Sequence, residues 1–341
     1  MFRAHVLIRA VVAGLFLVTG LFPFLPLAHA VEAMMFEYTD TYCFGRFLVD
    51  VPREAELRGQ DNQFYAKRID VGRGKEAFQA KIEEALNKRK NETGKRGFKL
   101  VRNEYPESVI NQIIVSKADL YGDILYLMDV FALRRPGYYF HFTAGPYDGE
   151  RIEKIVAVYR DLVLPALRHR PEYEIPREPG FCFENGFIAV EGERGENESA
   201  SLAFRLKDYP DVWIRIRSMV YFAPEKPLIE RHRNANPPSF LHEDSVRQRS
   251  VNGMDGDEVL VSGRYEGNSF HNYEWETLGE LKNPLKPSLA LRIKTGEAVH
   301  GKPVSTALDT EQVRKLYETV LKSIRFRPTG EAATANVPSS R

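Results

Sequence analysis

Cysteine is almost absent from this sequence: of its 341 residues only 2 are cysteines, at positions 43 and 182. Two thiols are too few for a disulfide-rich scaffold or for a zinc site built from four cysteines. The sequence also lacks an excess of one charge, with 48 Lys and Arg against 47 Asp and Glu. This balance argues against a nucleic-acid-binding protein, and the 43% of hydrophobic residues excludes a wholly disordered chain.

Recognisable catalytic and cofactor motifs are missing as well. The sequence has no Gly-x-Ser-x-Gly nucleophile elbow. The six histidines after residue 30 form no His-x-x-x-His or His-Glu-x-x-His pair. A short Gly-Arg-Gly-Lys run at 72–75 lacks the spacing of a phosphate-binding loop. From these absences we predict no enzymatic activity, no catalytic residue, no metal site and no cofactor.

Long apolar runs are confined to the first thirty residues. Arg3 and Arg9 precede an apolar stretch over 10–27, and Ala-His-Ala follows at 28–30. This order predicts a secretory signal peptide over 1–30, with no other segment long enough to span a bilayer. Removing its two arginines leaves 46 bases and 47 acids, a net charge of −1. We therefore expect an exported chain that is not membrane-anchored after signal cleavage, in an oxidising compartment.

Two segments, each containing one of the cysteines, have similar sequences. Residues 42–52 read YCFGRFLVDVP, and residues 181–190 read FCFENGFIAV. Each half also ends alike, in RHRP at 168–171 and RFRP at 325–328, after a helix-like pattern. The two halves begin with similar segments, end with similar segments and keep the same order of elements. This agreement indicates an internal duplication. The predicted division is a signal peptide at 1–30, related domains at 31–174 and 175–328, and a disordered tail at 329–341.

Hydrophobic spacing predicts helices over 75–91, 152–163 and 313–324, with Asp309 and Gln312 as a capping pair before the last. Strand-like runs occur at 109–116, 124–133, 138–144, 201–206, 212–220, 257–265 and 288–294. Strands come in groups, with helices at the ends of the groups. This order predicts an α+β fold of two related domains, each an antiparallel sheet with one or two packed helices.

Two features are candidate functional sites. Cys43 and Cys182 lie at the starts of apolar strands, and the sequence leaves open whether they are two buried thiols or one disulfide. The second is an acidic, glycine-containing loop that is either a solubilising hairpin or a partner-binding loop. Its charged residues are Glu191, Glu193, Arg194, Glu196 and Glu198.

The cysteine-containing strands carry a resemblance to a known family. The run CFGRFLVDVP at 43–52, just after a signal peptide, resembles the opening of the immunity proteins that neutralise type VI secreted lipase effectors. The second run, from Gly180 to Ile188, is similar to the start of that family's C-terminal domain. The resemblance implies a periplasmic, non-enzymatic protein whose two immunity domains clamp over the active-site entrance of a cognate lipase or phospholipase effector.

Two other functions compete with this interpretation. One is a periplasmic lipid- or small-molecule-binding protein with its ligand between the two domains. The other is an exported hydrolase that uses dispersed side chains, such as His271 with Glu274 or Glu276. A deep apolar cleft between the domains would favour the first, and a compact cluster of those side chains would favour the second.

Overall fold

The computed structural model describes residues 35–65, 68–91, 97–120, 122–192 and 197–330. The predicted signal peptide and residues 331–341 of the predicted tail lie outside these ranges. Within the described ranges, no helix is both long and apolar enough to cross a membrane.

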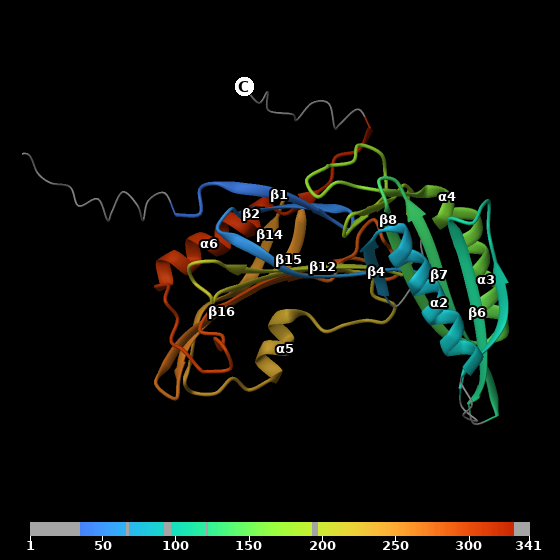
Figure 1. Cartoon of the computed structure of the whole chain (residues 1–341). Coiled ribbons are helices and arrows are strands. Elements are labelled where there is room, and N and C mark those ends of the chain that lie inside the picture. The colour runs from blue at the N-terminus through green and yellow to red at the C-terminus, as the bar shows by residue number, and fades with distance from the viewer. Residues whose placement is uncertain (1–34, 66–67, 92–96, 121, 193–196, 331–341) are drawn as a thin grey trace, which may run out of the picture. The chain divides into compact units, whose positions relative to one another are not determined.

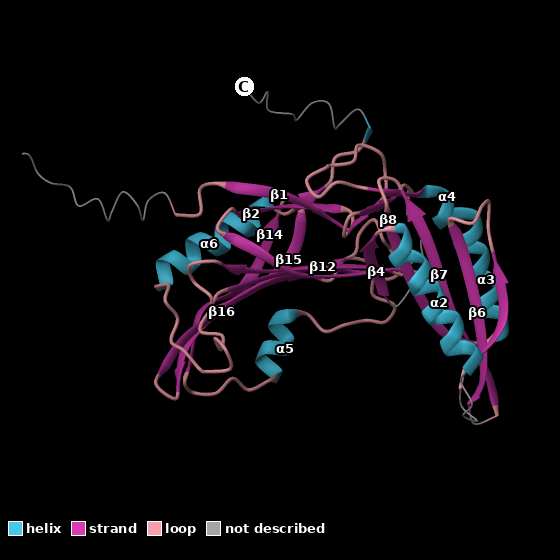
Figure 2. Cartoon of the chain, in the orientation of Figure 1, coloured by secondary structure: helices cyan, strands magenta, loops and turns pink. Residues whose placement is uncertain are grey.

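Strands dominate the secondary structure, as Figure 2 shows. The strands before residue 170 are β1 (Thr39–Phe44), β2 (Phe47–Pro52), β3 (Ala55–Phe64), β4 (Arg68–Arg73), β5 (Lys99–Glu104), β6 (Asn111–Leu120), β7 (Asp123–Arg134), β8 (Tyr138–Tyr147) and β9 (Leu167–His169). Those after it are β10 (Phe181–Phe183), β11 (Gly186–Ile188), β12 (Glu198–Leu206), β13 (Trp213–Met219), β14 (Leu241–Val251), β15 (Met254–Tyr265), β16 (Asn268–Thr277), β17 (Ser288–Lys294) and β18 (Arg325–Phe326). The helices are α2 (Lys75–Asn91), α3 (Gly149–Val158), the π-helical turn η1 (Tyr159–Val163), α4 (Leu164–Ala166), α5 (Leu228–Asn234) and α6 (Thr310–Ser323).

One antiparallel sheet has the strand order β4-β8-β7-β6-β5, and helical elements pack on both of its faces. Phe131 of β7 packs with Phe78 of α2 on one face. Phe131 pairs with His141 across the sheet, so the neighbouring Phe142 points to the other face, because side chains alternate along a strand. There Phe142 contacts Tyr159 of η1, with ring centroids 5.3 Å apart. Figure 1 accordingly shows β7 and β6 between α2 and α3.

A second antiparallel sheet has the order β14-β15-β16-β17-β13-β12-β3. On one face, Tyr317 of α6 contacts Tyr273 of β16 at a centroid distance of 5.7 Å. On the opposite face, Leu228 of α5 packs with Val259 and Val261 of β15. Helices α5 and α6 therefore lie on opposite sides of this sheet (Figure 2). Because α5 is short, it covers the β14–β16 side of its face, and no helix of the described residues packs closely on the β12–β13 side.

Two small sheets connect the halves of the chain by exchanging strands. The β1–β2 hairpin takes β18, the last strand, as its third member. The β10–β11 hairpin takes β9, which precedes the predicted boundary at 174/175. Both sheets are antiparallel and have the third strand next to the second hairpin strand. The two cysteine-containing segments thus fold alike, and each is completed by the end of the other half.

The predicted α+β class with antiparallel sheets is confirmed. The helix expected over 75–91 is α2, and Asp309 and Gln312 form the reciprocal capping box of α6. The division at 174/175 stays a prediction. Strand β3 from the first half pairs with β12 from the second, and from Phe36 onward the chain is one compact unit.

Candidate functional site

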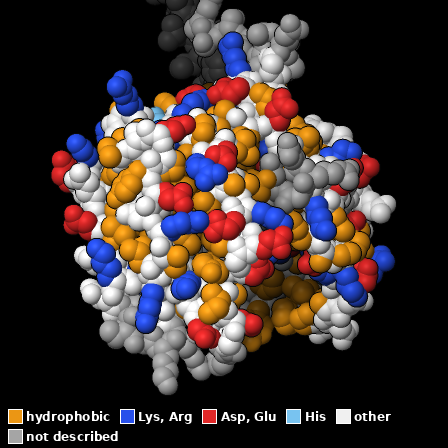
Figure 3. Space-filling view, turned by 90° about the vertical axis from the view of Figure 1, so that its right-hand side faces the viewer, with side chains coloured by type: hydrophobic (Ala, Val, Ile, Leu, Met, Phe, Trp, Pro, Cys, Tyr) orange, Lys and Arg blue, Asp and Glu red, His pale blue; other side chains and the backbone are white. Residues whose placement is uncertain are grey.

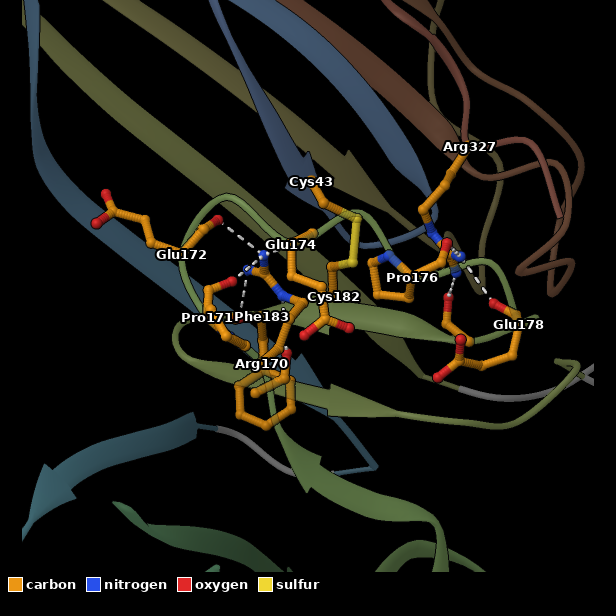
Figure 4. The surroundings of a disulfide bond; sticks show 12 residues. Cys43, Arg170, Pro171, Glu172, Glu174, Pro176, Glu178, Cys182, Phe183 and Arg327 are labelled. Atoms are coloured by element: carbon orange, nitrogen blue, oxygen red, sulfur yellow. Dashed lines mark hydrogen bonds between the residues drawn. A yellow bond between two sulfur atoms is a disulfide. The ribbon is translucent and has the colours of Figure 1, made fainter. Parts of the chain in front are cut away.

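A disulfide joins Cys43 of β1 to Cys182 of β10, with their Cα atoms 5.8 Å apart and 139 positions between them in sequence. Each hairpin presents its cysteine toward the other hairpin, as Figure 4 shows. Backbone pairing continues beside the bond, where Gly45 and Cys182 exchange N–H···O hydrogen bonds of 2.8 and 2.7 Å. Leu48 and Phe187 enclose the sulfurs in a small apolar cluster. No reactive thiol remains at this position, and the bond ties the two hairpins together.

Two buried arginines hold the proline-rich segment that connects the halves (Figure 4). Arg170 donates to the carbonyl oxygens of Glu172 at 2.9 Å and Glu174 at 3.0 Å. Arg327 donates to the carbonyls of Glu178 and Gly180, both at 2.7 Å. Burial lowers the pKa of each guanidinium to about 10. Because these side chains satisfy backbone carbonyls that would otherwise be unpaired, the 171–180 connection is a braced segment and not a free linker.

The predicted acidic loop is divided by the structure. Glu191 is exposed, while Glu193, Arg194 and Glu196 lie outside the described residues. Glu198 corrects the prediction, because it is 4% exposed at the start of β12 and accepts a 2.9 Å hydrogen bond from Nε of Arg46. Its carboxylate faces the interior and balances a buried guanidinium, so it is not available to a partner.

The dispersed residues of the hydrolase hypothesis are not brought together. His271 is buried and contacts the hydroxyls of Thr295 and Thr310, both at 3.2 Å. Burial lowers its pKa. Glu274 and Glu276 lie three and five positions further along β16 and therefore point to the opposite face. There they bind Arg292 and Arg231, which occupies both carboxylates in ion pairs.

Cavities give little support to a ligand held between the halves. A cavity lined by residues of both halves, among them Tyr42, Arg170 and Leu202, has a volume of about 200 Å³. Typical small-molecule sites occupy roughly 300–1,000 Å³. A larger hollow of about 530 Å³ lies wholly within residues 240–304.

The outer surface around the five-stranded sheet is mixed in character. Figure 3 shows acidic and basic side chains interspersed over this side, with hydrophobic side chains between them. Exposed apolar residues cluster in sequence around the β5–β6 connection: Val101, Tyr105, Val109 and Ile110. Val109, with 77% of its surface exposed, is the extreme case. An exposed apolar group of this kind marks a candidate interaction surface.

The helix-free part of the seven-stranded sheet is the most distinctive surface. We call it the open face and define it by Arg205, Trp213, Arg215, Arg217 and Arg292. Buried and accessible residues alternate along β13, so the tryptophan and two arginines of this strand point the same way. The alternation WIRIRSM at 213–219 is visible in the sequence, where it predicts a strand but does not show that its polar side is left uncovered. The accessible side of β13, which carries Trp213, Arg215 and Arg217, is therefore a candidate binding surface that the sequence analysis did not identify.

Comparison with known proteins identifies the relatives of this architecture. Residues 174–329 match the family model described as Tle cognate immunity protein 4 C-terminal domain. No curated protein sequence is a significant match. The resemblance predicted from the cysteine-containing strands is confirmed by the family match.

Solved structures share the fold over most of the chain. An apo structure of the immunity protein TplEi of the T6SS from Pseudomonas aeruginosa has a TM-score of 0.74 and 23% identity, covering 86% of this chain and 98% of that one. A crystal structure of a Tle4–Tli4 complex contains a chain with a TM-score of 0.74 and 24% identity, with the same two coverages. TplEi bound to an "L" peptide has a TM-score of 0.68 and 22% identity, covering 86% of this chain and 100% of that one. At these identities the likeness establishes the fold.

Proposed function

We propose that this chain, whose residues 174–329 belong to the Tle cognate immunity protein 4 C-terminal domain family, is an immunity protein for a type VI secreted lipase or phospholipase effector. It binds its cognate effector and inhibits it by clamping over the active-site entrance. The family match carries the proposal, and the shared fold over 86% of the chain supports it beyond the matched domain.

Rigid coupling of the two halves supports the clamp. The disulfide, the exchanged strands β9 and β18, and the hydrogen bond from Arg170 to the carbonyl of Phe183 all connect elements from opposite halves. A preorganised inhibitor loses less conformational entropy when it binds. The predicted immunity domains at 31–174 and 175–328 then act as two arms. The first carries the exposed apolar group around Val109, and the second carries the open face.

A non-enzymatic role agrees with the interior chemistry. His271, Glu274 and Glu276 are each engaged by internal partners, and the cysteines are bonded to each other. The proposed location is the periplasm, reached through the signal peptide at 1–30, because a disulfide is stable in that oxidising compartment. The loop residues Glu191, Glu193, Arg194 and Glu196 remain proposed contacts for a basic region of the effector.

The decisive experiment uses the lipase encoded beside this chain. The two proteins are co-expressed with a tag on the lipase, and phospholipid hydrolysis is measured with increasing amounts of the purified immunity protein. We expect a stable complex and stoichiometric loss of lipase activity. An unrelated periplasmic protein serves as the control. A lipase that neither retains this chain nor loses activity in its presence would refute the proposal.

A further inference from the structure

The arginines of the open face are arranged in a way that folding does not favour. Arg215 of β13 lies directly opposite Arg292 of β17 in the register of the sheet. Like charges in directly opposed positions destabilise a sheet. Glu274 neutralises only Arg292, through a 2.9 Å contact to Nε. Among the described residues, Arg215 and Arg217 have no carboxylate partner, so this arrangement calls for an explanation outside the fold.

Trp213 fixes part of this charge in place. The guanidinium carbons of Arg205 and Arg215 lie 5.4 and 5.0 Å from the centroid of its ring. Cation–π contacts of this kind hold long side chains over the ring, and all three residues stand on paired strands. Tryptophan and arginine are also the residues that dominate binding energy in protein interfaces. The open face is therefore preorganised for recognition.

A shallow cavity of about 270 Å³ adjoins the arginines. Its lining includes Arg215, Arg217 and Arg292 together with the apolar Ala203 and Ala290. Charged groups around an apolar floor suit a partner segment that offers both carboxylates and a small apolar side chain.

Nearby acids do not neutralise this surface. Asp61 of β3 faces Ser201 of β12, and Ser201 in turn faces Arg217. Two strand spacings, about 10 Å, therefore separate the backbones of Asp61 and Arg217, and the described residues show no ion pair between their side chains. Glu274 is already bound to Arg292. Positive charge is left in excess at Arg215 and Arg217.

The position of α5 decides between a protein and a membrane as the partner. Trp213 pairs with Lys294, Lys294 with Asn272, and Asn272 with Val261, which places all four on one face. Helix α5 packs on Val261 and so stands on this same face, which is the side of the sheet opposite α6 in Figure 2. A flat lipid surface would meet α5 before it reached the arginines, whereas a protein segment fits beside the helix.

We propose that the open face binds an acidic segment of the effector, and that Arg215 and Arg217 each form an ion pair with one carboxylate of that segment. This inference rests on the proposed function and specifies the chemistry of the partner. Residues two apart on a strand are separated by ~6.8 Å, so an extended segment with acids at positions i and i+2 matches the pair. Guanidinium groups bind carboxylates in bidentate geometry. This geometry fixes the orientation of the bound carboxylate and strengthens the contact.

The test is a charge reversal at both arginines, Arg215→Glu with Arg217→Glu, in the full mature chain. Binding to the purified lipase is measured by surface plasmon resonance at two salt concentrations. We expect Kd to rise more than ~100-fold and the salt dependence of the association rate to weaken. Lys117→Glu is the matched control, because Lys117 is an exposed strand residue of the other sheet, and it should leave Kd within twofold.

The outcomes separate this inference from the proposed function. If the native chain inhibits the lipase and the double variant binds equally well, the open face is not the contact and the inference fails alone. If the native chain does not bind the lipase, the proposed function fails and the inference falls with it. Thermal unfolding and circular dichroism check the fold, and Arg215→Lys with Arg217→Lys, which keeps the charge, should restore part of the affinity. Binding to phosphatidylglycerol vesicles that is lost in the charge-reversal variant, while lipase binding persists, would also overturn the inference.

Discussion

Removal of the disulfide should destabilise this protein strongly without changing its folded structure. The perturbation is the double variant Cys43→Ala and Cys182→Ala. In the folded state the two hairpins stay paired through the reciprocal bonds between Gly45 and Cys182, since these bonds use only backbone atoms. The exchanged strands β9 and β18 also remain. The cost of losing the bond therefore arises mainly in the unfolded state.

The expected magnitude follows from the length of the closed loop. The bond spans 139 positions, and this loop includes the whole five-stranded sheet with α2 and α3. Chain-entropy arithmetic for a loop of this length gives about 5 kcal/mol at 25 °C. Total unfolding free energies of domains are typically about 5–15 kcal/mol. The bond thus accounts for a large share of the stability.

Urea unfolding measures this difference directly. The native chain is compared without reductant, with reductant, and as the double alanine variant. Reduced native chain keeps both sulfur atoms in the cluster with Leu48 and Phe187, so it isolates the cross-link from the packing. We expect both bond-free forms to lose several kcal/mol, and reductant to have no further effect on the variant. A loss below about 1 kcal/mol in reduced native chain would refute the unfolded-state argument.

Two further predictions concern ion pairs. Arg46→Met removes the guanidinium that pairs with the buried carboxylate of Glu198 and should cost about 3–5 kcal/mol. Arg53→Met removes an exposed ion pair and should cost under ~1 kcal/mol in the same unfolding assay. Hydrogen bonds from Arg249 hold the pKa of Glu318 at about 2, so its contribution to stability is present above pH ~4.3 and is lost as the pH falls toward 2. Glu318→Gln should therefore flatten the acid side of the stability profile, and an unchanged profile would contradict the assignment.

The long helices and most central strands were predictable because their signals are local, whereas the short helix α5 and the central strand β16 were missed. Helix α2 and the capping box of α6 follow from spacing within one or two turns. The other missed strands of the two large sheets are β3, β14, β4 and β5, and all four lie at sheet edges. Edge strands are polar in compensation for their open side, so β3 reads AELRGQDNQF with no apolar alternation. Its strand conformation depends on pairing with β12, far along the chain.

The candidate binding surfaces also depend on contacts between residues far apart in the sequence, which a local pattern does not reveal. Glu198 ends an acidic run and reads as solvated, but its burial depends on Arg46, which lies 152 positions away. On the open face, the alternation of β13 was available in the sequence. The opposition of Arg215 and Arg292 was not, because it requires the register between β13 and β17. Local pattern identifies which side chains share a face, and only the pairing of strands shows which charges meet there.

Near-equal numbers of acids and bases do not make this protein electrically uniform. Two arginines at the connection between the halves, Arg170 and Arg327, donate to backbone carbonyls, which carry no formal charge. Arg46 is instead matched to a buried acid. At Arg215 and Arg217 neither kind of partner neutralises the charge. Because ions screen charges beyond about 8–10 Å, the proposed effector segment would respond to this local excess and not to the net charge of the chain.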